Sequence, residues 1–237
     1  MDTIISLVPS IPGNIIIFFP SFGYLNDCFY QWQRDGRMRL LSSIKEVYKE
    51  EVGMSNEEFG RIVRNLEKVQ YDRGAILLAV CRGKASEGID FSDNMCRCVI
   101  MTGVPYPSFG DMKVKMRREY LDTKNRQQLL FNERSKQAVA RNDPHIPTHY
   151  EDLPLASLFN LKAESFTGND WYNISAFRAV NQSVGRAIRH KDDFGIILLM
   201  DERFGAPQSQ EKLSKWLRPF IKDDEFTSIV GIMELMM

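Results

Sequence analysis

Short unbroken runs of apolar residues alternate along the chain with longer segments in which apolar residues recur every three or four positions. Unbroken runs rich in Ile, Val and Leu are typical of parallel strands covered on both faces, and the recurring pattern is typical of amphipathic helices. The alternation predicts an α/β three-layer fold with a mostly parallel sheet and right-handed crossovers. The runs predicted as strands are 14–19, 75–81, 98–103 and 195–201.

Two predicted helices carry clear start signals. Ser21 is a good N-cap for the first, and Ser55 followed by Glu58 forms a capping box before the second. Their apolar positions are Phe22, Leu25, Phe29 and Trp32 in the first helix, and Phe59, Ile62, Val63 and Leu66 in the second. Further helices are expected at about 111–136, 170–190 and 208–217, the last ending before Pro219.

The segment 141–168 contains three prolines and no periodicity, so it is interpreted as a loop or an insertion. The predicted organisation is therefore a lead-in segment or fragment edge at 1–12, one α/β domain at 13–222 with an insertion at about 123–168, and a C-terminal segment at 223–237.

Composition adds limits to this picture. Of the 237 residues, 43% are hydrophobic and 11% aromatic, which supports a packed core. Thirty-one basic residues balance thirty-one acidic ones, so any site for a polyanion must be local. Four cysteines form no pair of C-x-x-C clusters, which fits a reducing compartment and argues against a zinc or iron–sulfur site here. Cys81 and Cys98 are predicted core residues. No apolar stretch approaches the ~20 residues that span a bilayer, so we expect a soluble intracellular protein without a membrane partner.

The most informative motif is 181–189, which reads Q-x-x-G-R-x-x-R within a helical pattern. On a helix, Gln182, Gly185, Arg186 and Arg189 fall in one arc. The opposite arc carries Phe177, Val180, Val184 and Ile188, which are expected to face the core. Guanidinium groups suit phosphate oxygens, and arginines commonly neutralise a transferring phosphoryl group. The alternative is a solvated basic face.

A second motif, 81–91, directly follows a predicted strand. Its glycines, lysine and serine allow close backbone approach to an oxyanion, and ligands of α/β sheets bind at this edge. The residues concerned are Gly83, Lys84, Ser86 and Gly88. An ordinary glycine turn is the alternative. Glu87 and Asp90 could hold a ribose hydroxyl, position a water or pair with the arginines, and their spacing does not choose among these roles.

Two further strand ends carry weaker candidates. Ser21 begins a helix, and helix N-termini at strand ends bind phosphate readily, but simple capping is the favoured explanation of this residue when it is judged alone. Tyr106 follows the third predicted strand and could stack on a base or pack against the insertion. The printed sequence contains no G-x-x-x-x-G-K-[ST] loop and no acidic D-E-x-H-type run to hold a metal ion. The chain therefore resembles one wall of a nucleotide site.

Four strings occur in order: I-F-F-P-S at 17–21, A-V-C-R-G-K-A-S-E-G-I-D-F-S-D at 79–93, G-V-P-Y-P at 103–107, and the stretch 181–204. Together they closely resemble the C-terminal motor domain of the xeroderma pigmentosum group D family of superfamily 2 DNA helicases. The resemblance covers about 13–220 and includes helicase motifs IV, V and VI. Within the family, it is strongest to the regulator-of-telomere-elongation and Fanconi group J branch.

This resemblance implies a RecA-like second motor domain of an ATP-dependent helicase that unwinds DNA with 5′→3′ polarity. It also implies a first motor domain, absent from this chain, that carries the phosphate loop, binds most of the ATP and Mg²⁺, and holds a 4Fe-4S cluster. The chain alone is then expected to be inactive. Single-stranded DNA, the first motor domain and DNA-repair proteins become the expected partners, and the nucleus the expected location.

The resemblance also assigns roles to residues. It places Arg186 and Arg189 at the γ-phosphate of ATP, with Gln182 helping to sense it. The nucleotide contacts implied are Glu87, Gly88, Asp90 and Gly185, and the DNA contacts are Ser21, Lys84, Ser86 and Tyr106. Arg203 matches an arginine with a structural role. The stretch 123–168 is longer than the family pattern, and the balanced charge is unusual for a DNA-binding module.

Two alternatives stay open. A helicase-derived domain could serve as a non-catalytic docking module for DNA or proteins in a repair complex. An RNA-directed helicase of the same superfamily shares the Q-x-x-G-R-x-x-R logic but fits the string at 79–93 poorly.

Overall fold

The computed structural model describes residues 1–86, 91, 93–140, 166–186, 188, 193–222 and 230–232. The chain divides into two compact units, one formed by Met1–Tyr106 with Ala176–Met237 and the other by Pro107–Ser175. The first unit contains the sheet and the sequence motifs, and the second contains the region where an insertion at about 123–168 is predicted.

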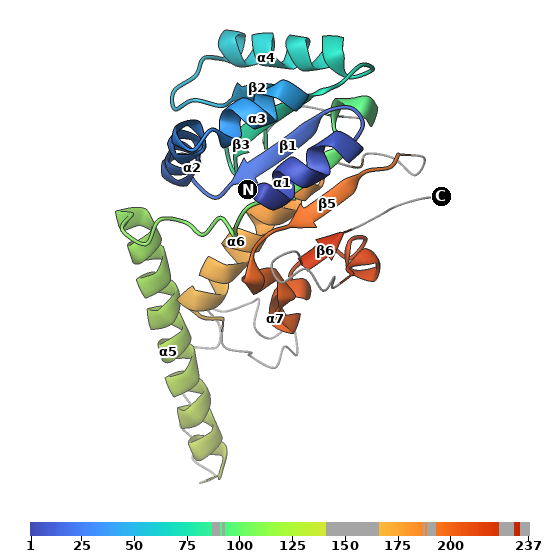
Figure 1. Cartoon of the computed structure of the whole chain (residues 1–237). Coiled ribbons are helices and arrows are strands. Elements are labelled where there is room, and N and C mark those ends of the chain that lie inside the picture. Colours follow the sequence, from blue (N-terminus) through green and yellow to red (C-terminus); the bar gives the residue numbers. More distant parts are fainter. Residues whose placement is uncertain are drawn as a thin grey trace. The chain divides into compact units, whose positions relative to one another are not determined.

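Among the described residues, one six-stranded sheet has the order β2-β3-β1-β4-β5-β6 (Figure 1). The strands are β1 Ile15–Phe19, β2 Glu46–Lys49, β3 Ala75–Val80, β4 Cys98–Met101, β5 Ile196–Leu199 and β6 Val230–Ile232. The first five run parallel to one another, whereas β6 pairs antiparallel with β5. The four predicted strands and the mostly parallel sheet are confirmed. The edge strand β2 is only partly buried and so lacks the unbroken apolar run that marks the others.

The helices of the first unit begin with α1 (Asp2–Leu7), α2 (Phe22–Arg34), α3 (Arg37–Ile44) and α4 (Asn56–Val69). After β5 comes the short α7 (Pro207–Gln210), and single 3₁₀ turns occur at Val8–Ser10, Asp93–Met95, Glu202–Gly205 and Arg218–Phe220. The predicted starts of two helices are confirmed. Ser21 caps α2, and Ser55 forms the predicted capping box with Glu58 before α4.

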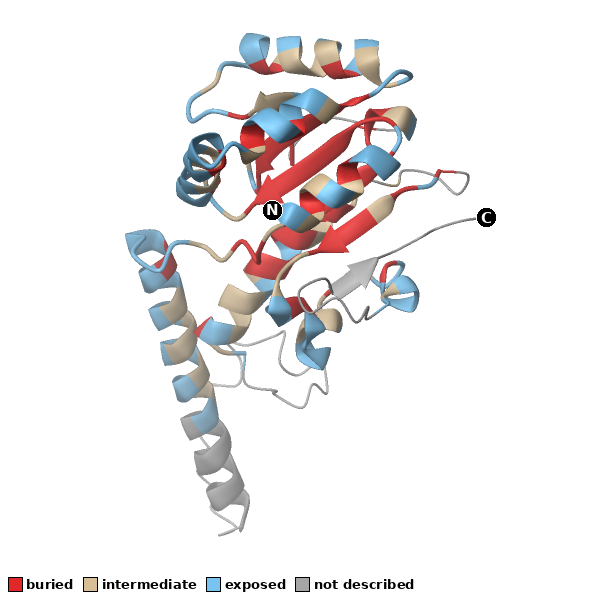
Figure 2. Ribbon diagram, in the orientation of Figure 1, coloured by how far each residue is buried: buried red, intermediate tan, exposed pale blue. Residues whose placement is uncertain are grey.

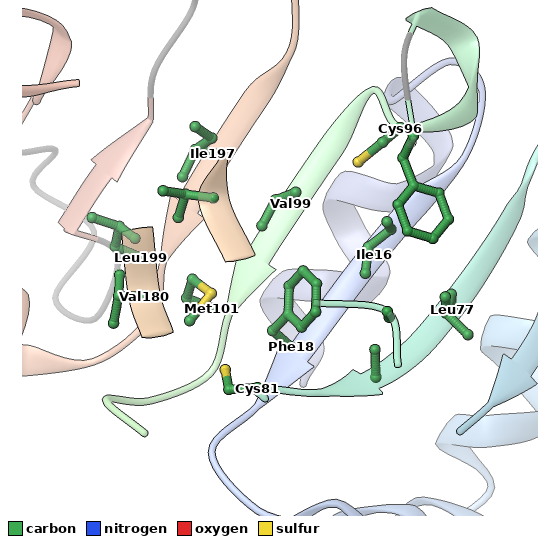
Figure 3. Close-up of a cluster of buried hydrophobic side chains, with 14 of the residues drawn as sticks. Ile16, Phe18, Leu77, Cys81, Cys96, Val99, Met101, Val180, Ile197 and Leu199 are labelled. Atoms are coloured by element: carbon green, nitrogen blue, oxygen red, sulfur yellow. The ribbon is translucent and has the colours of Figure 1, made fainter. Parts of the chain in front are cut away.

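Both faces of the central strands β1, β3 and β4 are buried, which makes the unit three-layered (Figure 2). One face packs against α1, α2 and α3, where Leu25 and Leu41 are fully buried. The other packs against α4 and the C-terminal half of α6 (Gly168–Val184), with Leu66 and Val180 inside it. Figure 3 shows side chains from neighbouring strands pointing into this second cluster. The continuous burial of β1, β3 and β4 explains their unbroken apolar sequences.

The segment 1–12 packs on the core. Ile4 of α1, together with Val8 and Ile11, is buried in the cluster that covers the first face. Residues treated as a lead-in from sequence therefore contribute to the same hydrophobic layer as α2 and α3.

Two predicted helices have different bounds in the structure. The helix predicted at 170–190 is α6, which ends at Val184, so Gly185 and Arg186 lie in a turn. The helix predicted at 208–217 stops after Gln210. Its continuation is replaced by tertiary hydrogen bonds, because the side chain of Asn181 binds the carbonyl of Lys212 at 2.9 Å and the N–H of Ser214 at 2.8 Å.

The second unit contains α5 (Met112–Ala140), which confirms the long helix predicted at about 111–136. In the same unit, the guanidinium of Arg118 lies 4.5 Å from the ring centre of Phe109 and 5.2 Å from that of Tyr172. The loop predicted at 141–168 lies almost entirely outside the described residues. Over the part of the chain that the structure describes, no helix is long and apolar enough to cross a membrane.

Candidate nucleotide and DNA site

The candidate residues gather where parallel strands end. The N–H of Cys81, just after β3, donates to Phe19 O of β1 at 2.9 Å, and the N–H of Thr102, just after β4, donates to Phe18 O at 3.0 Å. Carboxyl ends of parallel strands meet at one edge of a sheet, which is where α/β proteins bind ligands. The segments that begin at Ser21, Cys81 and Thr102 therefore start from adjacent points on this edge.

Ser21 is exposed and serves as the N-cap of α2. Its Oγ accepts a hydrogen bond from the N–H of Tyr24 at 3.2 Å. The capping interpretation is thus confirmed, and the phosphate contact stays a prediction. A phosphate at this position would also meet the first N–H groups of α2, which have no partner inside the helix.

A tight turn follows β3. Arg82 adopts a left-handed conformation with φ of +65°, and the N–H of Gly83 donates to Val80 O at 2.9 Å. Ser86 closes the next turn, because its N–H and its Oγ donate to Gly83 O at 3.2 and 2.9 Å. Ser86 is buried, so its carbonyl and hydroxyl are held inside the loop.

A buried carboxylate that belongs to neither sequence motif holds this turn. Glu50, one residue after β2, is 1% exposed, and its carboxylate accepts hydrogen bonds from the backbone N–H groups of Val80 at 3.0 Å and Lys84 at 2.6 Å. Burial raises the pKa of Glu50, while the two N–H donors and the nearby Lys84 ammonium act in the opposite direction. In the sequence Glu50 stands in a charged run, K-E-E, which looks like an exposed strand end.

The Lys84 ammonium points toward α4. Its Nζ lies 2.5 Å from Oδ1 of Asn56, the first residue of that helix. Lys84 is half-buried rather than fully solvated. The loop therefore offers a cation held at a defined position, which suits contact with a backbone phosphate.

The end of α6 meets this loop. Ser183 Oγ lies 3.7 Å from Sγ of Cys81, and Nη2 of Arg186 donates to Ser86 O at 2.6 Å. Gly185 and Arg186 form a tight turn, since their N–H groups donate to Asn181 O and Ser183 O, both at 3.1 Å. The structure thus brings together the motifs at 81–91 and 181–189, through residues 100 positions apart in the sequence.

The other residues of the Q-x-x-G-R-x-x-R motif take different environments. Gln182 is exposed, Gly185 is half-buried, and Val184 is fully buried as predicted for the core-facing arc. Glu87, Gly88, Asp90 and Arg189 lie outside the described residues. Their predicted nucleotide contacts stay predictions.

Tyr106 packs under an arginine. The guanidinium of Arg203 lies 5.5 Å from the centre of the Tyr106 ring and is held by Asp201, with Nε 2.7 Å from Oδ1. Asp201 follows β5 and also caps the turn that begins at Glu202. Tyr106 is half-buried against the core cluster, so part of its ring stays open to solvent.

The possible metal ligands and the cysteines decide which cofactors the described residues could hold. Over the described ranges, no group of three or more His, Cys, Asp or Glu side chains could hold a metal ion. All four cysteines are free thiols, and Cys81 and Cys98 are buried, as predicted. Burial raises the pKa of the Cys81 thiol to about 12, so this sulfur is a core group.

The first unit is a three-layer α/β domain in which the motifs at 81–91 and 181–189 meet at Ser86 and Arg186. The family described as "Helicase C-terminal domain" matches residues 4–220, which is most of the chain. The chain belongs to this family, within the xeroderma pigmentosum group D type that its motifs indicate. The predicted resemblance is confirmed.

Relatives with similar sequences include two proteins named "Regulator of telomere elongation helicase 1 homolog". The protein from Anopheles gambiae is 37% identical over 98% of this chain and 20% of its own length, and that from Drosophila grimshawi is 36% identical over 92% and 18%. The chain thus spans about a fifth of the length of these relatives. A solved structure named "XPD_APO" shares the fold, with a TM-score of 0.51 and 19% identity over 89% of this chain and 33% of that one.

Proposed function

We propose that this chain is the second motor domain of an ATP-dependent 5′→3′ DNA helicase. In this proposal a first motor domain binds ATP and Mg²⁺ and carries a 4Fe-4S cluster, while this domain supplies Arg186 and Arg189 to the γ-phosphate. Single-stranded DNA crosses the edge where β1, β3 and β4 end. The proposal places the protein in the nucleus with DNA-repair proteins, in keeping with the telomere function named in its relatives.

The observation that carries the proposal is the contact between Arg186 and Ser86. Nη2 of Arg186 lies 2.6 Å from Ser86 O, so the arginine motif and the strand-end loop form one structural unit. A shift of the loop when DNA binds would move the guanidinium, and closure of the two motor domains would bring it to the γ-phosphate. Such coupling is how motor domains link hydrolysis to movement.

The chemistry assigned to this chain is charge stabilisation. A guanidinium offers planar donors to the phosphate oxygens as charge develops on them during transfer. Arginines in this position contribute about 10³–10⁵-fold to turnover in other NTPases. Lys84 and the N-terminus of α2 at Ser21 would contact DNA phosphates, and the open part of the Tyr106 ring would stack on a base.

The test is Arg186→Ala in the complete helicase, with Arg178→Ala as control, because Arg178 is an exposed arginine on the same helix. Arg186→Ala should reduce DNA-stimulated ATP hydrolysis by about 10³-fold or more while ATP binding persists. Arg178→Ala should hydrolyse ATP normally. Turnover of Arg186→Ala near the wild-type rate would remove the proposed role.

A second measurement concerns the substrate strand. Hydrolysis should respond to single-stranded DNA and not to RNA of the same sequence, and Lys84→Ala should raise the DNA concentration that gives half-maximal stimulation. It should also reduce the salt slope of DNA binding by about one. Equal stimulation by RNA would favour an RNA-directed helicase instead.

A further inference from the structure

Glu50 differs from the other charged residues near the strand ends, because it is buried and bound to backbone. It lies beyond β2, and its own N–H donates to Leu78 O of β3 at 2.8 Å. This bond fixes the Glu50 backbone against the neighbouring strand. The side chain then reaches across the end of β3, where one oxygen accepts from Val80 and the other from Lys84.

The two acceptor bonds enclose the turn after β3. Val80 is the last residue of the strand, and Lys84 lies beyond the left-handed Arg82. The Glu50 carboxylate therefore joins the end of β3 to Lys84, on the far side of the turn that follows this strand. Because a carboxylate has two acceptor oxygens and no donor, it matches two converging N–H groups in a way that an amide side chain cannot.

Gly83 shows how closely the carboxylate is packed. A Cβ at this position would lie 2.4 Å from Oε1 and 2.8 Å from Oε2 of Glu50. Such contacts are far inside the van der Waals limit, so the carboxylate occupies the space that a side chain at residue 83 would need. A Cβ would also lie 2.8 Å from the backbone oxygen of Val80, so the Glu50 carboxylate and the strand end together leave room only for glycine at this position of the motif.

The turn that Glu50 holds leads directly to the arginine motif. Gly83 O accepts from both the N–H and the hydroxyl of Ser86, and Ser86 O accepts from Arg186. A chain of hydrogen bonds therefore runs from the Glu50 carboxylate through the turn to the guanidinium. Lys84, proposed to contact DNA, is a member of the same chain.

We propose that Glu50 is a positioning residue that couples the DNA contact of Lys84 to the phosphate contact of Arg186. This inference rests on the proposed function. Glu50 touches neither ligand. It fixes the backbone from Val80 to Lys84, so that displacement of Lys84 by DNA is transmitted to Ser86 O and from there to Arg186.

The experiment compares Glu50→Gln with Ile76→Val in the complete helicase. Glutamine keeps the shape of the side chain but replaces one acceptor oxygen with an NH₂ group that faces a backbone N–H. Ile76→Val removes one buried methylene from β3 at the opposite end of the strand, so it lowers stability without touching the turn. Melting temperature, DNA-stimulated turnover and the DNA concentration for half-maximal stimulation are measured for both.

Glu50→Gln should lower turnover by about 10- to 100-fold and raise the half-maximal DNA concentration, with ATP binding unchanged. Ile76→Val should change only the melting temperature. In this chain alone, hydrogen exchange of the Lys84 amide should accelerate in Glu50→Gln and not in Ile76→Val. That readout does not depend on catalysis.

Two outcomes would overturn the inference. In the first, Glu50→Gln keeps the turnover and the DNA response of the wild type while Arg186→Ala is inactive. Glu50 would then have no coupling role, and the proposed function would stand. In the second, both Glu50→Gln and Ile76→Val lose activity in proportion to the decrease in their melting temperatures. Glu50 would then contribute to stability only. Failure of the proposed function itself would appear separately, as an active Arg186→Ala variant.

Discussion

Arg186 and Ser86 are one hundred positions apart in the sequence, and Nη2 of the arginine donates to the carbonyl oxygen of the serine at 2.6 Å. The bond joins the turn after α6 to the loop after β3. It holds the Arg186 guanidinium in a defined orientation within this domain. In the proposed function, an orientation fixed in this way would lower the entropic cost of bringing the guanidinium to a phosphate.

Replacement of Arg186 by lysine separates the two parts of this role. The lysine ammonium can still donate to Ser86 O, but it cannot present a planar set of donors to phosphate at the same time. We expect Arg186→Lys in the complete helicase to keep the melting temperature within error and to lose most DNA-stimulated turnover. Turnover close to wild type would show that one positive charge is sufficient.

Gly83→Ala tests the packing between the turn and Glu50. The new Cβ would lie 2.4 Å from the Glu50 carboxylate and 2.8 Å from the backbone oxygen of Val80, so the turn must shift or a buried hydrogen bond must break. We expect a loss of about 1–3 kcal/mol in the free energy of unfolding. Chemical denaturation of this chain followed by circular dichroism measures it.

Gly60→Ala is the matched control. Gly60 lies within α4, and a Cβ there would meet only the flexible end of Arg64 at 3.4 Å. Alanine is the better helix former, so the free energy of unfolding should rise by up to about 1 kcal/mol. The same sign for both variants would contradict the packing described for Gly83.

The buried ion pair between Arg97 and Asp193 predicts a large stability effect. The closest atoms are 2.7 Å apart, and the two side chains are only 7% and 0% exposed. Asp193→Ala would leave the guanidinium buried without this carboxylate. We expect a loss of about 3–5 kcal/mol in the free energy of unfolding, measured by urea denaturation.

An exposed pair provides the comparison. Arg61 and Glu57 lie 3.5 Å apart on α4, with side chains 63% and 81% exposed. Glu57→Ala should change the urea midpoint little, because exposed ion pairs contribute little to stability. An Asp193→Ala variant as stable as Glu57→Ala would contradict the large contribution to stability that is expected from the buried ion pair.

Asp201 predicts how stability depends on pH. Burial alone would raise the pKa of this carboxyl, but hydrogen bonds and charge from Arg203 outweigh it and lower the pKa below the ordinary value of 3.8. Because the pKa of Asp201 is lower in the folded protein than in the unfolded chain, its ionised carboxylate stabilises the fold above pH 3.8. This contribution is lost as the pH falls through the pKa of the folded protein. Asp201→Asn should therefore be less stable than wild type near neutral pH, and the gap should narrow below about pH 4. A gap that is constant with pH in urea denaturation would contradict this assignment.

Local patterns were sufficient for most of the first unit. The strands β1, β3, β4 and β5 appear as apolar runs because both faces of the sheet are covered, and the start of α4 follows from Ser55 and Glu58 alone. Those signals depend on neighbouring residues only. The edge strand β2 was not predicted, because it is only partly buried and its sequence mixes polar and apolar residues.

Errors arose where a distant residue changed the backbone pattern. Local periodicity continues through 208–217, yet the Asn181 side chain takes the carbonyl of Lys212 and the N–H of Ser214, and the helix ends early. The motif helix also ends earlier than predicted, at Val184. Helix propensity is weak compared with a pair of such tertiary hydrogen bonds.

By itself, the sequence determined the α/β class, the main strands, the buried cysteines Cys81 and Cys98, and membership of a helicase family, because each depends on local composition or on a contiguous motif. Only the tertiary structure decided that Arg186 meets Ser86 and that Glu50 holds the turn between Val80 and Lys84. Those contacts join segments 30 to 100 residues apart. Their geometry depends on how parallel strands are ordered in the sheet, and no spacing along the chain encodes that order.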